Sequence, residues 1–160
     1  MLEVILFTKD VVFVAQALEN VLSKIDQQKN LLNVKKFIHA LNFNNIENLQ
    51  SDVDQEFIEI ISKIFKFYSK NFFKIMLKLQ ENLIHKMYNK RIAYVFSSSD
   101  NSVSLKFLNS ISGHDFLEDQ IQQIFIKNLD GVIVHYDNMT FNNTSENIKN
   151  IFKKEILKML

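Results

Sequence analysis

The sequence lacks cysteine and proline altogether and has only two glycines, Gly113 and Gly131. Without cysteine, the chain has no disulfide, no thiolate nucleophile and no cysteine ligand for a metal. Two isolated glycines cannot build either of the familiar glycine-rich phosphate loops, which excludes nucleotide binding of that kind. No apolar run approaches the roughly 20 residues of a membrane-spanning helix, and the N-terminus does not have the pattern of a signal peptide. We therefore expect a soluble or peripheral protein.

An excess of charge of one sign is also missing. The 19 basic and 18 acidic residues nearly cancel, which leaves a formal net charge of +1. They are interspersed along the chain, so no long-range field favours nucleic acid, and we expect none as a partner. Apolar side chains are plentiful, at 47% of 160 residues with 15 phenylalanines, so the composition predicts a folded chain with a real core.

The first 90 residues show apolar positions at helical spacing. Two amphipathic stripes run through 11–25 and 31–41, and the asparagine-rich residues 42–45 should end the second helix. The acidic, serine-led segment 51–56 predicts a helix start near Asp52, with Phe57, Ile61 and Phe65 among its buried residues. A longer stripe over 72–90 predicts a further helix.

From residue 91 the pattern changes to that of strands. Residues 91–98 are β-branched and aromatic, a short helix over 102–111 should be closed by Gly113, and 116–126 should end as a strand. A turn at 128–131 leads into a hairpin of 132–136 and 139–141, and a helix follows from Thr144. We predict an α+β fold, with an N-terminal helical bundle over 1–90 and a small strand and helix domain over 91–160.

Residue types that carry catalysis or bind metals occur without the required spacing. The four histidines have no second histidine or carboxylate at the separation that two ligands on one helix face require. Ser97–Asp100 has no glycine elbow and no indicated base. The acids from Asp52 to Glu59 do not match a calcium loop and are better explained as helix-start acids. We expect no catalytic residue, no cofactor and no metal site, and protein binding as the default function.

The residues around Gly131 resemble a known family. Leu129–Val134, followed by Tyr136–Phe141, is similar to the C-terminal signature of the delta subunit of the F-type ATP synthase, called the oligomycin-sensitivity-conferring protein in mitochondria. The helical pattern over 57–76 and the strand 93–98 are also similar to that family. Asp130 replaces the second glycine of the family's turn, and residues 142–147 blur its Asp-x-Ser element.

The resemblance implies a non-catalytic stator subunit of the peripheral stalk. Its helical domain would bind the N-terminal helices of the alpha subunits, and its C-terminal part would bind the end of the b subunits. The chain would then lie at the cytoplasmic face of the bacterial inner membrane, held there through the complex without inserting itself. We assign partner binding to nine residues: Phe13, Ala17, Leu18, Val21, Gly131, Ile148, Lys149, Phe152 and Ile156.

Three other functions stay open at this point. The E-type stalk subunit of vacuolar ATPases also ends in a glycine turn, a strand and a basic helix, but a long uninterrupted N-terminal helix would be expected. A small enzyme could use His114 with Asp115 or Asp119 beside Tyr136, provided that these groups converge. A helical scaffold or regulator unrelated to ATPases would need only the apolar stripes.

Overall fold

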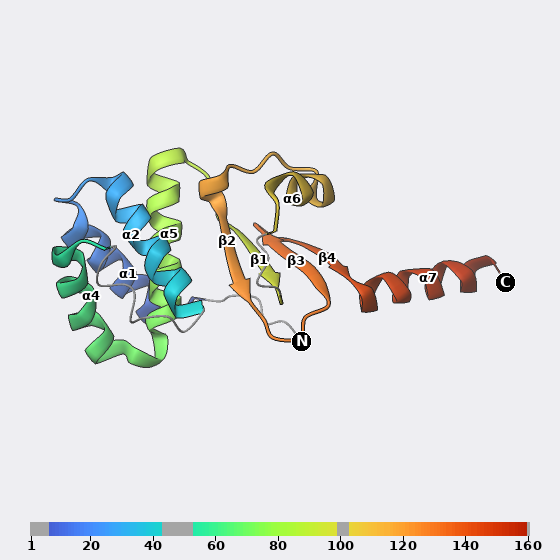
Figure 1. The fold of residues 1–160 in the computed structure, drawn as a ribbon, viewed down its shortest axis with the longest axis horizontal. Coiled ribbons are helices and arrows are strands. Elements are labelled where there is room, and N and C mark those ends of the chain that lie inside the picture. The colour runs from blue at the N-terminus through green and yellow to red at the C-terminus, as the bar shows by residue number, and fades with distance from the viewer. Residues whose placement is uncertain (1–6, 43–52, 99–102, 160) are drawn as a thin grey trace. The chain divides into compact units, whose positions relative to one another are not determined.

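The computed structural model describes residues 7–42, 53–98 and 103–159. The chain divides into two compact units, Met1–Lys90 and Arg91–Leu160. Among the described residues, the first unit is helical, and the second contains a four-stranded sheet, two α-helices and the short 3-10 helix η3 (Glu118–Gln120) (Figure 1). The predicted α+β class is confirmed.

The helical unit contains α1 (Lys9–Leu22), α2 (Gln27–Asn42), α4 (Gln55–Tyr68) and α5 (Phe72–Tyr88). α1 begins where the Thr8 hydroxyl accepts a hydrogen bond from the Val11 amide, and α1 and α2 both pack against α5. The buried apolar side chains recur every three or four residues, as amphipathic helices require. They include Val11, Val14, Ala15, Leu18, Leu22, Leu31, Val34, Ile38, Phe57, Ile61, Ile75, Met76, Leu79 and Leu83.

The start of α4 differs from the prediction. The helix begins at Gln55, and the expected start, Asp52, lies outside the described residues. Asp54 precedes the helix without capping it through its side chain; its carboxylate instead lies 2.8 Å from the Lys29 ammonium of α2. The expected burial of Phe65 is wrong, because its side chain is 47% exposed although its ring contacts Phe72.

The second unit is built on a sheet with strand order β2-β1-β3-β4. β1 (Ala93–Ser97) pairs in parallel with β2 (Ile121–Phe125) and antiparallel with β3 (Gly131–Tyr136), which forms a hairpin with β4 (Met139–Thr144). α6 (Leu105–Ser112) lies between β1 and β2 in the chain and ends at Gly113, which has a left-handed conformation as predicted. The predicted strands and hairpin are confirmed, and β4 runs beyond the expected 139–141.

One face of the sheet carries the core of this unit. Ala93, Val95 and Val134 face α6, which contributes Leu108, and Phe116 from the following loop completes the buried cluster. Tyr136 and Phe141 pack around its edge. Alternate residues of β1 and β3 reach this side because successive strand side chains point to opposite faces.

The last helix, α7 (Ser145–Met159), follows β4 directly. Thr144 starts it, because its hydroxyl accepts a hydrogen bond from the Asn147 amide at 3.3 Å. None of the described residues of α7 is buried, and β4 is the element with which α7 makes most contact (Figure 1). The apolar stripe that predicted the helix therefore stays open to solvent.

Candidate interaction surfaces

The strongest candidate surface is the apolar side of α7. Ile148, Phe152 and Ile156 recur at every fourth position, which places them on one face of the helix. They are 42%, 65% and 56% exposed, whereas a helix that packs in its own domain buries such a face. The sequence prediction singled out these three residues; Ile151, at 52% exposed, lies on the same side and was not among them. We name Ile148, Ile151, Phe152 and Ile156 the α7 face.

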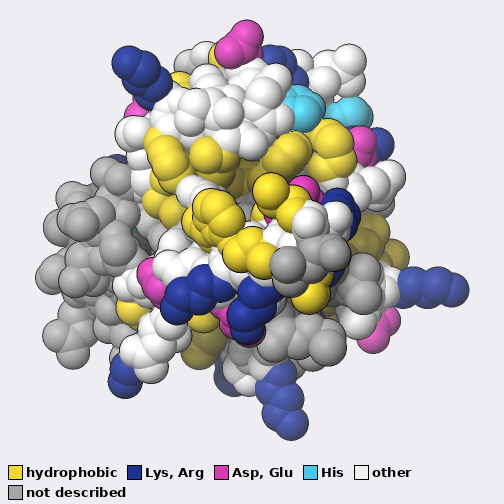
Figure 2. All heavy atoms as spheres, turned by 90° about the vertical axis from the view of Figure 1, so that its right-hand side faces the viewer, with side chains coloured by type: hydrophobic (Ala, Val, Ile, Leu, Met, Phe, Trp, Pro, Cys, Tyr) yellow, Lys and Arg dark blue, Asp and Glu magenta, His cyan; other side chains and the backbone are white. Residues whose placement is uncertain are grey.

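Basic side chains accompany the α7 face. Lys149, Lys153 and Lys154 are exposed, and Glu155 is paired with Lys158 at 2.8 Å. Figure 2 looks from the side on which α7 extends and shows hydrophobic side chains gathered there beside lysine or arginine side chains. Exposed apolar side chains grouped in this way, rather than scattered singly, are typical of a contact surface for a partner.

The candidate residues of α1 divide into two groups. Phe13 and Val21 are 75% and 54% exposed, and Ala17 between them is exposed too. Their spacing of four residues forms an outward stripe, which we name the α1 face. Leu18 is only 2% exposed and belongs to the core of the bundle, so it is not available to a partner.

Gly131 acts through the backbone. It begins β3 with a φ of +106°, a conformation that residues with a side chain rarely adopt. A Cβ atom at this position would collide with the carbonyl oxygen of Asn143 and lie 2.8 Å from the Cα of Thr144. The glycine therefore allows β3 and β4 to approach each other, which is a structural role whether or not a partner also touches it.

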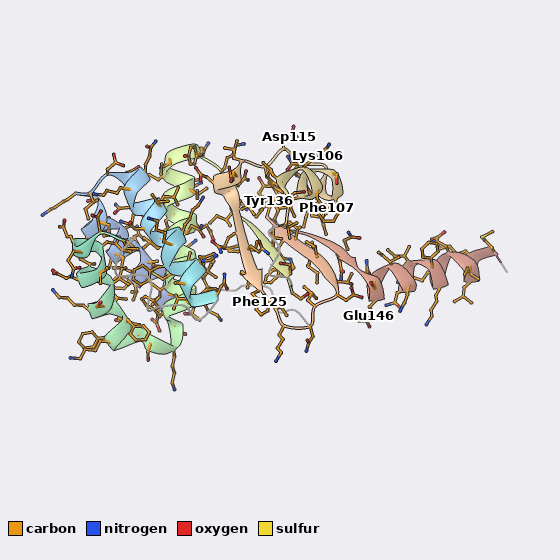
Figure 3. All side chains as sticks on the ribbon, viewed as in Figure 1. Lys106, Phe107, Asp115, Phe125, Tyr136 and Glu146 are labelled. Carbon is orange, nitrogen blue, oxygen red and sulfur yellow. The ribbon has the colours of Figure 1, made fainter. Side chains whose placement is uncertain are left out.

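His114 packs against aromatic rings on the α6 side of the sheet. Its Nδ1 lies 2.9 Å from the Ser112 carbonyl oxygen, and its ring contacts Phe116, Tyr136 and Phe141. Asp115 is exposed at the outer edge of the loop after α6, whereas Tyr136 lies beneath α6 (Figure 3). The contacts of His114 are those of a packing residue, and no general acid–base pair is formed with Asp115.

His135 points to the other face of the sheet. Its Nδ1 lies 2.7 Å from the Thr140 hydroxyl, and its ring meets the Phe96 ring edge-on. Removal from water lowers the pKa of His135 below its usual value, because the charged imidazolium loses hydration. The neutral form is favoured, which suits a structural histidine.

Among the residues that the structure describes, no group of three or more histidine, aspartate and glutamate side chains is arranged to hold a metal ion. Within the same ranges, no helix has the length and apolar character needed to cross a bilayer. Comparisons of the chain with protein-family models, with curated proteins and with solved structures find no match. The α7 face and the α1 face are thus the main features on which a function can be argued.

Proposed function

We propose that the chain is a peripheral-stalk subunit of an F-type ATP synthase, which links the catalytic head to the membrane part. In this role, the α1 face binds the N-terminal helices of alpha subunits and the α7 face binds the C-terminal end of the b subunits. The observation that carries the proposal is the exposure of the α7 face on a helix that has no buried residue among those described. The choice of the alpha and b subunits as partners comes from the resemblance of residues 129–141 to the delta family.

The chemistry of the surfaces suits a stator. A stator must resist torque, which requires broad contacts that dissociate slowly rather than a reactive group. Buried aromatic side chains contribute most to such contacts, and Phe13 and Phe152 are the large aromatic residues of the two faces. The faces belong to different units of the chain, as a link between two partners requires.

Binding measured with purified partners tests the proposal. The probes are a peptide of the alpha-subunit N-terminus and the C-terminal segment of the b subunit from the same source, titrated calorimetrically into the full chain. The double substitution Phe13→Ser with Val21→Ser should weaken the binding of the alpha peptide at least tenfold and leave the affinity for the b segment unchanged. Phe152→Ser with Ile156→Ser should have the opposite pattern. These residues are exposed, so both variants should keep the wild-type circular dichroism spectrum.

Matched controls lie beside each face. Gln16→Ser changes an exposed residue of α1 outside the stripe, and Asn150→Ser does the same on α7. Neither control should alter binding by more than about twofold. If the wild-type chain bound neither probe, or if the face variants behaved like the controls, the stator proposal would be wrong.

Two alternative functions predict different observations. The vacuolar stalk subunit is disfavoured because α1 and α2 are separate helices, with a break between Leu22 and Gln27, rather than one long helix. A scaffold or regulator unrelated to ATPases would use the exposed faces but bind neither probe.

A further inference from the structure

A third surface lies where α4 turns into α5, and the stator role does not use it. Between Glu59 and Glu81 the sequence has no acidic residue but five lysines, at positions 63, 66, 70, 74 and 78. The turn itself is the short 3-10 helix η2 (Ser69–Asn71). We name Lys63, Lys66, Phe67, Tyr68, Lys70 and Lys74 the basic tip.

The aromatic residues of the basic tip are not needed by the core. α4 buries Phe57 and Ile61 on its inner side, and Phe65 leans on the Phe72 ring with 5.0 Å between ring centroids. Phe67 is 76% exposed and Tyr68 41% exposed. The apolar surface of these two rings is unfavourable in water, and a ligand that covered the rings would be stabilised by their burial.

The lysines of the basic tip have no acidic side chain paired with them among the described residues. Lys63, Lys66, Lys70 and Lys74 are exposed, and within the described ranges none of them forms an ion pair. Lys78 is different, because it is paired with Glu81 at 2.9 Å. Four exposed ammonium groups close in sequence to two exposed rings suit a ligand that is both anionic and able to accept aromatic side chains.

We infer that the basic tip binds the surface of an anionic lipid membrane. The turn lies at one end of α4 and α5 (Figure 1), and a lipid surface can accept lysines and aromatic rings that are presented together in this way. Phosphate and carboxylate headgroups neutralise the lysines, and the rings enter the headgroup layer. The inference concerns the chain by itself and goes beyond the stator proposal, in which the chain reaches the membrane only through its partners.

Sedimentation with vesicles tests it on the full chain. The probes are vesicles of phosphatidylcholine alone and vesicles that also contain phosphatidylserine. The chain should sediment only with the anionic vesicles, and should be released when ionic strength rises from about 0.1 M to about 1 M, because the Debye length falls from about 10 Å to about 3 Å. Lys66→Gln with Lys70→Gln should weaken binding about twenty-five-fold, at roughly fivefold per lysine. Phe67→Ser should weaken it about tenfold.

α7 supplies the matched control, because it is also basic and amphipathic. Lys153→Gln with Lys154→Gln removes the same charge from the same chain and should leave vesicle binding within about twofold. Loss of binding in this variant but not in the tip variant would assign the membrane contact to α7 and overturn the inference. Absence of binding to anionic vesicles would also overturn the inference. If soluble polyglutamate bound the basic tip as strongly as the anionic vesicles do, an acidic protein would replace the membrane as the proposed ligand.

Discussion

Gly131 at the start of β3 lies directly against the backbone of Asn143 on β4, so closely that no side chain fits between them. Gly131 therefore has a structural role in the hairpin of β3 and β4. Gly113 has a positive φ as well, of +68°, but nothing lies within 4 Å of the place where its Cβ would be. The two glycines therefore differ in how much they tolerate substitution.

Gly131→Ala should destabilise the second unit by about 2 kcal/mol or more, because strain at a positive φ is added to a steric collision. Gly113→Ala should cost only about 1 kcal/mol, since strain alone is involved. Urea denaturation followed by circular dichroism measures both. Equal destabilisation by the two variants would contradict the close approach of β3 to β4.

A second comparison separates core from surface. Leu108→Ala removes a fully buried side chain between α6 and the sheet and should lower the free energy of unfolding by about 2–5 kcal/mol. Phe152→Ala truncates a larger side chain on the α7 face and should change it by less than about 0.5 kcal/mol. If Phe152→Ala destabilised the free chain as much as Leu108→Ala, the α7 face would be part of a core.

The histidine on β3 predicts a pH dependence. The pKa of His135 in the folded chain is below the 6.5 of a free histidine, so between these two values the unfolded chain binds more protons. Its contribution to stability is therefore complete above about pH 6.5 and is lost as the pH falls through the folded pKa. Melting temperatures recorded between about pH 8 and pH 5 should decline less in His135→Gln than in the wild type. Parallel curves would argue against a neutral, partly desolvated His135.

An ion pair joins Lys29 of α2 to Asp54, the residue that precedes α4. The Lys29 ammonium donates a hydrogen bond to Asp54 and, as the nearest positive charge, lowers the pKa of that carboxyl, which favours the charged form. The pair stabilises the fold above the usual pKa of aspartate, and its contribution disappears as the pH falls through the lowered value. Asp54→Asn should therefore lower the melting temperature slightly near neutral pH and not at all in strong acid. Lys63→Gln, an unpaired neighbour on α4, should have no such pH-dependent effect.

The helix at the end of the chain predicts a difference in hydrogen exchange. A 15-residue helix without a packed face is only marginally stable in water. The amides of α7 should exchange much faster than those of α5, which has eight buried residues. Addition of a partner that covers the α7 face should slow exchange in α7 alone. Slow exchange in the free chain would show that α7 is already covered.

The elements were predictable where periodicity was strong. The helices of the first unit follow from apolar residues three and four apart, and the strands from the β-branched runs beside Gly131. The start of α4 was less predictable, because Asp54 could either cap the helix or pair with Lys29, and only the folded arrangement brings Lys29 near.

Exposure was the least predictable property. Leu18, Phe65 and Phe152 all occupy apolar positions of amphipathic helices, yet the first is buried and the other two are largely exposed. The helical period identifies an apolar face but not what covers it, since that depends on contacts far away in the chain.

The sheet order also governs the order of events during synthesis. β1 occupies a central position, with Ala93 beside Ile121 of β2 and Tyr136 of β3, and both neighbours leave the ribosome after it. The first unit has emerged in full by then, and its helices form largely through local contacts, which are made quickly. The apolar strand Ala93–Ser97 must therefore wait unpaired during translation, which makes it the segment where a chaperone would be most useful.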